Sequence, residues 1–355
     1  MNKNTKSNYK HRYTTAKYNQ NNIKKKNTKT LPSALPQIFT LMLFLTIAAA
    51  SFAVLMDKPE FLLNDSTPSY STFQNPSSEI AEGNPVIRQG KITEITENIS
   101  STNAILMNLD TGRVICEKNS DTVSYPASLT KIMSAIIAIE NIPDPDYTQI
   151  TVSKEIVERL TAENSSMAGF SGGETVSATD LLYGCLLSSG GEATSALAEY
   201  VAGSEEAFVT KMNTKAYELD CKDTNFTNVT GLHNLKHTST AKDIATIFKY
   251  ALENDTFRNI ITSANYYTAP TDQHPFGITL TSTVYSAFSS AGIDMNNIKG
   301  GKTGYTPEAR QCLATYYVSG SNRYILVTLG AGNGNNTTYD NVKDADTIYK
   351  NYIKE

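Results

Sequence analysis

The first 56 residues of this chain contain no aspartate or glutamate, although they contain nine lysines and arginines. The chain as a whole has a formal net charge of −4, so the residues after 56, with 22 basic and 35 acidic side chains, have a net charge of −13. A basic arm can bind nucleic acid, but this one leads directly into an uncharged apolar run. We therefore interpret it as a topology signal and expect no nucleic-acid partner.

Cysteine and histidine are also scarce, and neither forms a metal-binding pattern. The spacing of Cys116, Cys185, Cys221 and Cys312 matches no metal knuckle. Cys185 falls in an apolar helical pattern and Cys312 in an apolar strand pattern, so we expect both to be buried free thiols, whereas the pairing of the four stays undecided. The two histidines of a candidate metal pair stand in a probable loop without an acidic neighbour, and we expect them to be structural; they are His233 and His237. We expect no metal and no cofactor.

The apolar run covers residues 38–56, which are uncharged. As a helix these 19 residues would be roughly 28 Å long, about one hydrocarbon thickness. Two interpretations fit: a cleaved signal peptide, favoured by the small residues around 48–53, or an uncleaved anchor, favoured by the long basic arm at 1–37. We favour the anchor. In both cases the basic arm keeps its end in the cytoplasm, so the remainder is extracytoplasmic, either held at the cell membrane by a single span or secreted.

Residues 57–95 lack sustained periodicity and are rich in Ser, Thr, Asn, Pro and Gln, which predicts a flexible extracytoplasmic linker. Residues 96–355 then form one predicted catalytic domain. Its pattern predicts a hairpin, a helical middle, a late group of strands and a last helix, which is an α+β fold with the early and late strands in one antiparallel sheet flanked by helices and a helical subdomain. The expected strands are 103–110, 113–118, 298–304, 312–319 and 323–330, with strand packing also expected for the tyrosine-rich 265–269; the expected helices begin at 128, 178, 192, 204, 240 and 340.

Ser128-Leu-Thr-Lys131 stands at the head of an apolar helical pattern. Positions i and i+3 of a helix share a face, so the Ser128 hydroxyl and the Lys131 amine are placed side by side. A serine becomes a strong nucleophile when a neighbouring base takes its proton, and a lysine can be that base if burial lowers its pKa. The tetrapeptide alone is also compatible with an N-cap serine followed by a solvated lysine.

Two later motifs support the catalytic interpretation. Ser189-Gly190-Gly191 follows a buried helix, and Lys302-Thr303-Gly304 lies on a probable strand. Together with the wider segments Tyr125–Met133, Asp180–Gly184, Ala196–Val201, Gly231–His233, His237–Ala241 and Gly301–Thr306, they resemble the D-alanyl-D-alanine carboxypeptidases, the low-molecular-mass penicillin-binding proteins. The resemblance extends from about residue 99 to the C-terminus and implies the β-lactamase/DD-peptidase fold.

The resemblance implies a serine-type hydrolase that removes the terminal D-alanine of peptidoglycan stem peptides. Ser128 would attack the carbonyl between the two D-alanines, and Lys131 would accept the hydroxyl proton. The backbone N–H groups of Ser128 and Tyr305 would form the oxyanion hole, and Ser189 would relay a proton to the leaving D-alanine.

Substrate binding would fall to the strand motif with its neighbour, Lys302, Thr303, Gly304 and Tyr305. Lys302 would also tune Ser189 electrostatically, and together with Thr303 it would hold the substrate's terminal carboxylate. β-Lactams would acylate Ser128 stably and act as inhibitors.

One position departs from the family pattern. Gly191 stands where the third residue of the middle motif is usually asparagine, whose amide would position the lysine and the substrate backbone. Water or Glu192 is a candidate replacement. Two alternatives share the same residues: a DD-endopeptidase that cuts cross-links, and a wall protein that binds or senses penicillin and acylates poorly because of Gly191. Glu163-Asn164 lacks the longer loop pattern of class A β-lactamases, so we assign it no deacylating role.

Many members of the family carry a further β-rich domain and a C-terminal amphipathic anchor. This sequence ends at Glu355, soon after the last expected helix. We therefore expect that the N-terminal segment 38–56 holds the protein at the membrane.

Overall fold

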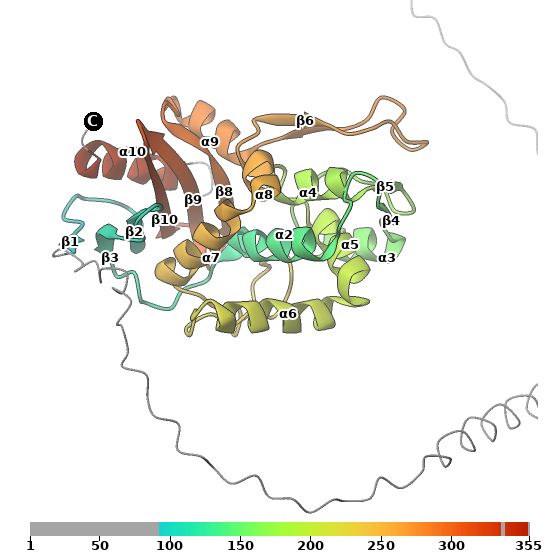
Figure 1. The fold of residues 1–355 in the computed structure, drawn as a ribbon, viewed down its shortest axis with the longest axis horizontal. Coiled ribbons are helices and arrows are strands. Elements are labelled where there is room, and N and C mark those ends of the chain that lie inside the picture. Colours follow the sequence, from blue (N-terminus) through green and yellow to red (C-terminus); the bar gives the residue numbers. More distant parts are fainter. Residues whose placement is uncertain (1–91, 335–337, 354–355) are drawn as a thin grey trace, which may run out of the picture. The chain divides into compact units, whose positions relative to one another are not determined.

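The computed structural model describes residues 92–334 and 338–353 (Figure 1). The predicted arm 1–37, the apolar segment 38–56 and most of the predicted linker lie outside the described residues. The first described strand, β1 (Thr93–Glu94), pairs in parallel with β3 (Val114–Lys118). Since β1 lies inside the segment predicted to be linker, the folded domain begins a few residues earlier than the predicted boundary at 95.

Among the helices that the structure describes, none has both the length and the apolar character needed to cross a membrane.

The central sheet has six strands in the order β1-β3-β2-β10-β9-β8. Apart from the short parallel pair β1 and β3, neighbouring strands are antiparallel. The early hairpin strand β2 (Asn103–Asn108) pairs with the late strand β10 (Asn322–Ala331), which confirms that both ends of the domain share one sheet. The remaining strands are β9 (Arg310–Ser319) and the edge strand β8 (Ile298–Thr306).

Both faces of this sheet are buried. Alternate residues of a strand point to opposite faces, so each strand contributes side chains to two cores. On β2, Ile105 and Met107 join the large core against the helical body, whereas Ala104 and Leu106 join a second core. The first core contains α7 (Ala241–Glu253), and the second contains α9 (Thr283–Ala291) and α10 (Asp340–Tyr352). Figure 1 shows α10 on the side of the sheet away from the helical body and α9 near the upper end of the strands.

The helical body surrounds one buried helix, α2 (Thr130–Asn141). Nine of its twelve residues are buried, which is the pattern of a helix that is covered on every side. Its neighbours are α4 (Ala178–Leu186), α5 (Gly191–Ala202) and α6 (Glu205–Glu218). At the start of α4 and of α6 a serine side chain accepts the backbone N–H of the third helical residue, which explains where these helices begin.

Several elements were not predicted, and most of them are short. A strand of three residues is too brief to show an alternating pattern, so its sequence cannot be told from a loop. These elements are α3 (Lys154–Ala162), β4 (Gln149–Thr151), β5 (Thr175–Ser177), α8 (Asp255–Ile261), β7 (Thr279–Thr281) and α9.

The tyrosine-rich stretch forms β6 (Asn265–Tyr267), as predicted. Its middle residue, Tyr266, stacks on Tyr183 with ring centroids 3.7 Å apart, and its hydroxyl donates to Asp180 at 3.0 Å. Packing is therefore the role of Tyr266.

All four cysteines are buried and free. Cys185 lies in α4 and Cys312 lies in β9, which confirms the prediction for these two side chains.

Candidate active site

Ser128 lies in a short 3₁₀ helix, η1 (Ala127–Leu129), immediately before α2. Ser128 was predicted to begin the α-helix, but it lies in the 3₁₀ turn just before it. The predicted contact between Ser128 and Lys131 is present. The Lys131 Nζ atom donates to the Ser128 Oγ atom at 3.1 Å. Lys131 is only 1% exposed, so the alternative of a capping serine followed by a solvated lysine is wrong.

The Lys131 amine is held in a buried environment. Its Nζ atom also donates to the backbone carbonyl of Thr230 at 2.8 Å. Burial lowers the pKa of Lys131 to about 8, against smaller opposing contributions from Cys185 and Glu192. A lysine with this pKa is neutral often enough near physiological pH to accept a proton from Ser128.

A buried histidine supports the turn that carries Ser128. The backbone N–H of Thr227 donates to His237 Nδ1 at 3.0 Å, so Nε2 carries the ring proton and donates to Thr130 Oγ1 at 2.8 Å. Thr130 in turn donates to the carbonyl of Ala127, at 2.8 Å. Burial lowers the pKa of His237 to about 4, so the ring is neutral at pH 7.

His233 lies edge-on to the ring of Tyr125, 4.8 Å between centroids. Both histidines thus have contacts that stabilise the nucleophile turn and its surroundings. These contacts agree with the structural role predicted for both histidines.

Two glycines allow other segments to approach the nucleophile turn closely. A Cβ atom at Gly231 would lie 1.9 Å from the carbonyl oxygen of Ala127, and Gly231 has a φ of +84°. A Cβ atom at Gly304 on β8 would lie 3.0 Å from the backbone nitrogen of Ser128. The sequence motifs at 231 and 304 therefore need glycine because backbone passes against backbone there.

Ser189 lies in the loop between α4 and α5, as predicted. It is 5% exposed and adopts a left-handed φ of +59°, a conformation that costs energy in a residue with a side chain. Its place is set by the helix on each side, and it reaches the same pocket as Ser128.

The strand motif contributes residues with two different environments. The Thr303 hydroxyl donates to Thr283 Oγ1 at 2.7 Å, so α9 orients it. Lys302 is fully buried and its Nζ atom donates to the carbonyl of Thr303 at 2.8 Å. Burial, and secondly the positive charge of Lys131, hold the pKa of Lys302 well below its usual range.

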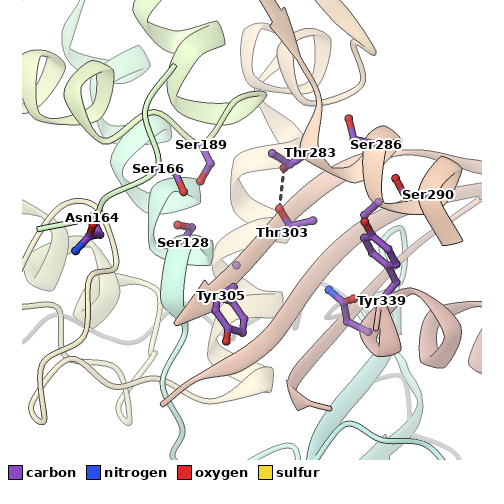
Figure 2. A pocket seen from close by; sticks show the side chains of 13 residues that line it. Ser128, Asn164, Ser166, Ser189, Thr283, Ser286, Ser290, Thr303, Tyr305 and Tyr339 are labelled. Carbon is purple, nitrogen blue, oxygen red and sulfur yellow. Dashed lines mark hydrogen bonds between the residues drawn. The ribbon is translucent and has the colours of Figure 1, made fainter. Parts of the chain in front are cut away.

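These segments enclose one cavity of about 470 Å³. Five of the residues predicted for the site line it, and Lys131 lies behind Ser128: the lining residues are Ser128, Ser189, Thr303, Gly304 and Tyr305. Figure 2 shows the side chains of Ser128, Ser189 and Thr303, which come from η1, the α4–α5 loop and β8. Lys302 of β8 is fully buried and is not among the lining residues.

Sequence reasoning missed further polar residues of the cavity wall. Thr283 comes from α9, and Asn164 and Ser166 come from the loop after α3. The available signal is the Ser165-Ser166 dipeptide that follows Glu163-Asn164, but two serines in a polar loop do not by themselves indicate a site. Its place opposite Ser189 depends on a fold that brings α3 and α5 together.

The arrangement has the parts that acyl transfer requires. A serine hydroxyl contacts a buried amine of lowered pKa, and a second serine lies across the pocket. The Thr303 hydroxyl and the backbone of the edge strand β8 form another wall of the pocket. The residues described by the structure hold no cluster of side chains suited to a metal ion.

Known proteins are similar to this chain in sequence and in fold. A family profile described as D-alanyl-D-alanine carboxypeptidase matches residues 90–333. The D-alanyl-D-alanine carboxypeptidase DacF of Bacillus subtilis (strain 168) is 34% identical over 253 residues, which cover 70% of this chain and 62% of that protein. The D-alanyl-D-alanine carboxypeptidase of Streptomyces sp. (strain K15) is 31% identical over 252 residues, which cover 67% of this chain and 84% of that protein. The solved Streptomyces K15 DD-transpeptidase has a TM-score of 0.64 at 27% identity and covers 72% of this chain and 98% of its own.

The close approach at Gly231 predicts a large loss of stability for Gly231→Ala. Gly203→Ala is the matched control, because Gly203 has a similar φ of +78° but open space where a Cβ would be. We expect the control to lower the free energy of unfolding by about 1 kcal/mol through its left-handed backbone alone. Gly231→Ala should lower it by at least about 3 kcal/mol, because the carbonyl of Ala127 must also move. Urea denaturation measures both, and equal losses would contradict the packing described here.

Proposed function

This chain belongs to the D-alanyl-D-alanine carboxypeptidase family of serine peptidases, and we propose that it removes the terminal D-alanine of peptidoglycan stem peptides through an acyl-enzyme on Ser128. The observation that carries the proposal is the hydrogen bond between the buried Lys131 amine and the Ser128 hydroxyl, at 3.1 Å. Ser128 lines a pocket together with Ser189 and Thr303.

In the proposed acylation, the Ser128 Oγ atom forms a bond to the carbonyl carbon between the two D-alanines, and its proton passes to neutral Lys131. The backbone N–H groups of Ser128 and Tyr305 stabilise the negative charge on the carbonyl oxygen. When the C–N bond breaks, a proton relayed by Ser189 reaches the departing amine. Water then cleaves the ester and regenerates the Ser128 hydroxyl.

Recognition of the terminal carboxylate is assigned to Thr303 and Lys302. The Thr303 hydroxyl lines the pocket and would exchange its bond to Thr283 for one to the carboxylate. The Lys302 amine is buried next to the Thr303 carbonyl, where a bound carboxylate would favour its charged form. Gly304 keeps this strand close to Ser128, so carboxylate and scissile carbonyl would be bound at adjacent points of one strand edge.

Two other functions use the same residues. A DD-endopeptidase would cut cross-links instead of removing a terminal D-alanine. A penicillin-sensing wall protein would acylate and release no D-alanine. Because all three functions use Ser128 and the same pocket residues, product analysis distinguishes them.

We expect a fluorescent penicillin to label the protein covalently, and Ser128→Ala to abolish the label, because the Ser128 hydroxyl lines the pocket and contacts the Lys131 amine. Diacetyl-Lys-D-Ala-D-Ala should release D-alanine, measured with a D-amino-acid oxidase assay. Labelling without release would favour the sensor, and cleavage of cross-linked muropeptides alone would favour the endopeptidase. Absence of labelling in folded wild type would overturn the proposed function.

The lowered pKa of Lys131 predicts how acylation depends on pH. With a pKa of about 8, roughly one-tenth of the amine is neutral at pH 7 and roughly nine-tenths at pH 9. Only the neutral form accepts the Ser128 proton, so the second-order rate constant for β-lactam acylation should rise by nearly tenfold between these pH values. Stopped-flow acylation, corrected for hydrolysis of the free β-lactam, measures it. A rate that is flat or falls over this range would remove Lys131 from the role of base.

We further propose that the catalytic domain faces the outside of the cell membrane and is held there by residues 38–56. The support is the uncharged run of 19 residues after a basic arm without a single acidic side chain. Stem peptides of the cell wall lie on that side. The alternative is secretion after cleavage of the same segment.

Fractionation of cells that produce the full chain tests this anchor. We expect the protein in the membrane fraction after washing at high salt and at alkaline pH, since an apolar span does not dissociate with ionic strength. The mature N-terminus should precede residue 38. A mature N-terminus near residue 54, with the protein in the soluble fraction, would instead show a cleaved signal peptide.

A further inference from the structure

The loop that follows α3 is fastened to the first turn of α5, the helix that begins directly after Ser189. The backbone N–H of Gly191 donates to the carbonyl of Ser166 at 2.7 Å. Glu192 is completely buried, and its Oε1 atom accepts the backbone N–H groups of Ala168, Gly169 and Phe170 at 2.7, 2.8 and 3.2 Å. Glu192 Oε1 is therefore committed to this loop, whereas Oε2 is buried with no hydrogen-bond partner among the described residues.

The volume next to Gly191 is occupied by the same loop. A Cβ atom at this position would lie 2.4 Å from Ser165 Oγ and 3.3 Å from a methyl carbon of Leu160. A side chain at 191 would have to turn the Ser165 hydroxyl aside, because real Cβ contacts are longer. The backbone N–H of Ser165 donates to the carbonyl of Leu160 at 2.9 Å, which ties the loop to the end of α3.

Ser166, the next residue, faces the catalytic cavity. It lines the same pocket as Ser128 and Ser189, and Figure 2 shows its side chain beside that of Ser189. Its hydroxyl has no hydrogen-bond partner among the described residues and is exposed to the pocket. A hydroxyl can donate to a carbonyl or accept from an N–H, so it can contact either group of a peptide backbone.

We propose that Ser166 is a substrate-positioning residue, which supplies from the loop after α3 the polar contact for which position 191 has no side chain. Glu192 acts through the loop backbone and keeps Ser166 at the pocket. The inference rests on the proposed function, since it concerns the same acylation of Ser128. It also means that Gly191 does not leave the site deficient.

The first test compares Ser166→Ala with Ser166→Thr and with Ser289→Ala. Ser289 is an exposed serine of α9 outside the cavity and is the matched control. We expect Ser166→Ala to lower kcat/KM for D-alanine release about three- to tenfold, the value of one neutral hydrogen bond. Ser166→Thr, which keeps the hydroxyl, should restore most of the rate, and the melting temperature of all three variants should equal that of the wild type.

The second test places asparagine at position 191. Gly191→Asn alone should not raise kcat/KM by more than about twofold, because Ser165 and Ser166 already occupy the space and the role. In the Ser166→Ala background the same asparagine should recover part of the lost rate, so the two substitutions are coupled.

The outcomes separate this inference from the proposed function. If the wild type releases D-alanine and Ser166→Ala has the same kcat/KM, the positioning role of Ser166 is overturned while the proposed function stands. A tenfold or larger gain for Gly191→Asn alone overturns it as well, because the site would then lack what asparagine supplies. Wild type that neither acylates nor releases D-alanine overturns the proposed function itself.

Discussion

The contact between the buried Lys131 amine and the Ser128 hydroxyl is the constraint on which the site depends. An amine is costly to bury in its charged form, and this cost is what lowers its pKa to about 8 and makes it a usable base. The burial comes from α2, which carries Lys131 and is covered by helices on every side. The amine donates a hydrogen bond to the carbonyl of Thr230. Helical packing and the chemistry of the nucleophile are therefore one feature of the fold.

Around this contact the pocket is made by backbone brought unusually close to backbone. Gly231 and Gly304 let a loop and the edge strand β8 pass against η1. A Cβ atom would collide with the chain at Gly231 and would be tightly crowded at Gly304. His237 and Thr130 hold the same turn from beneath through side-chain hydrogen bonds. A rigid nucleophile turn is the result, with its hydroxyl directed at the cavity and its support fully inside the domain.

The departure at Gly191 acquires a different meaning when the loop after α3 is considered. In sequence it is the loss of an asparagine. In space, the position is covered by Ser165, the neighbouring Glu192 binds the loop backbone, and Ser166 is presented to the pocket. A motif read residue by residue cannot show such a replacement, since the replacing group comes from 25 residues earlier in the chain.

Much of the domain follows from local sequence. The long strands and helices, the shared sheet of β2 and β10, and the pairing of Ser128 with Lys131 were predictable because periodicity and i, i+3 spacing are properties of neighbouring residues. The order of the motifs placed the chain in its family. Only the tertiary structure decided that Ser128 lies in a 3₁₀ turn, that Lys302 is fully buried, and that Asn164, Ser166 and Thr283 join the pocket. These features depend on contacts between segments far apart in sequence, and a local sequence pattern does not indicate which distant segments come into contact.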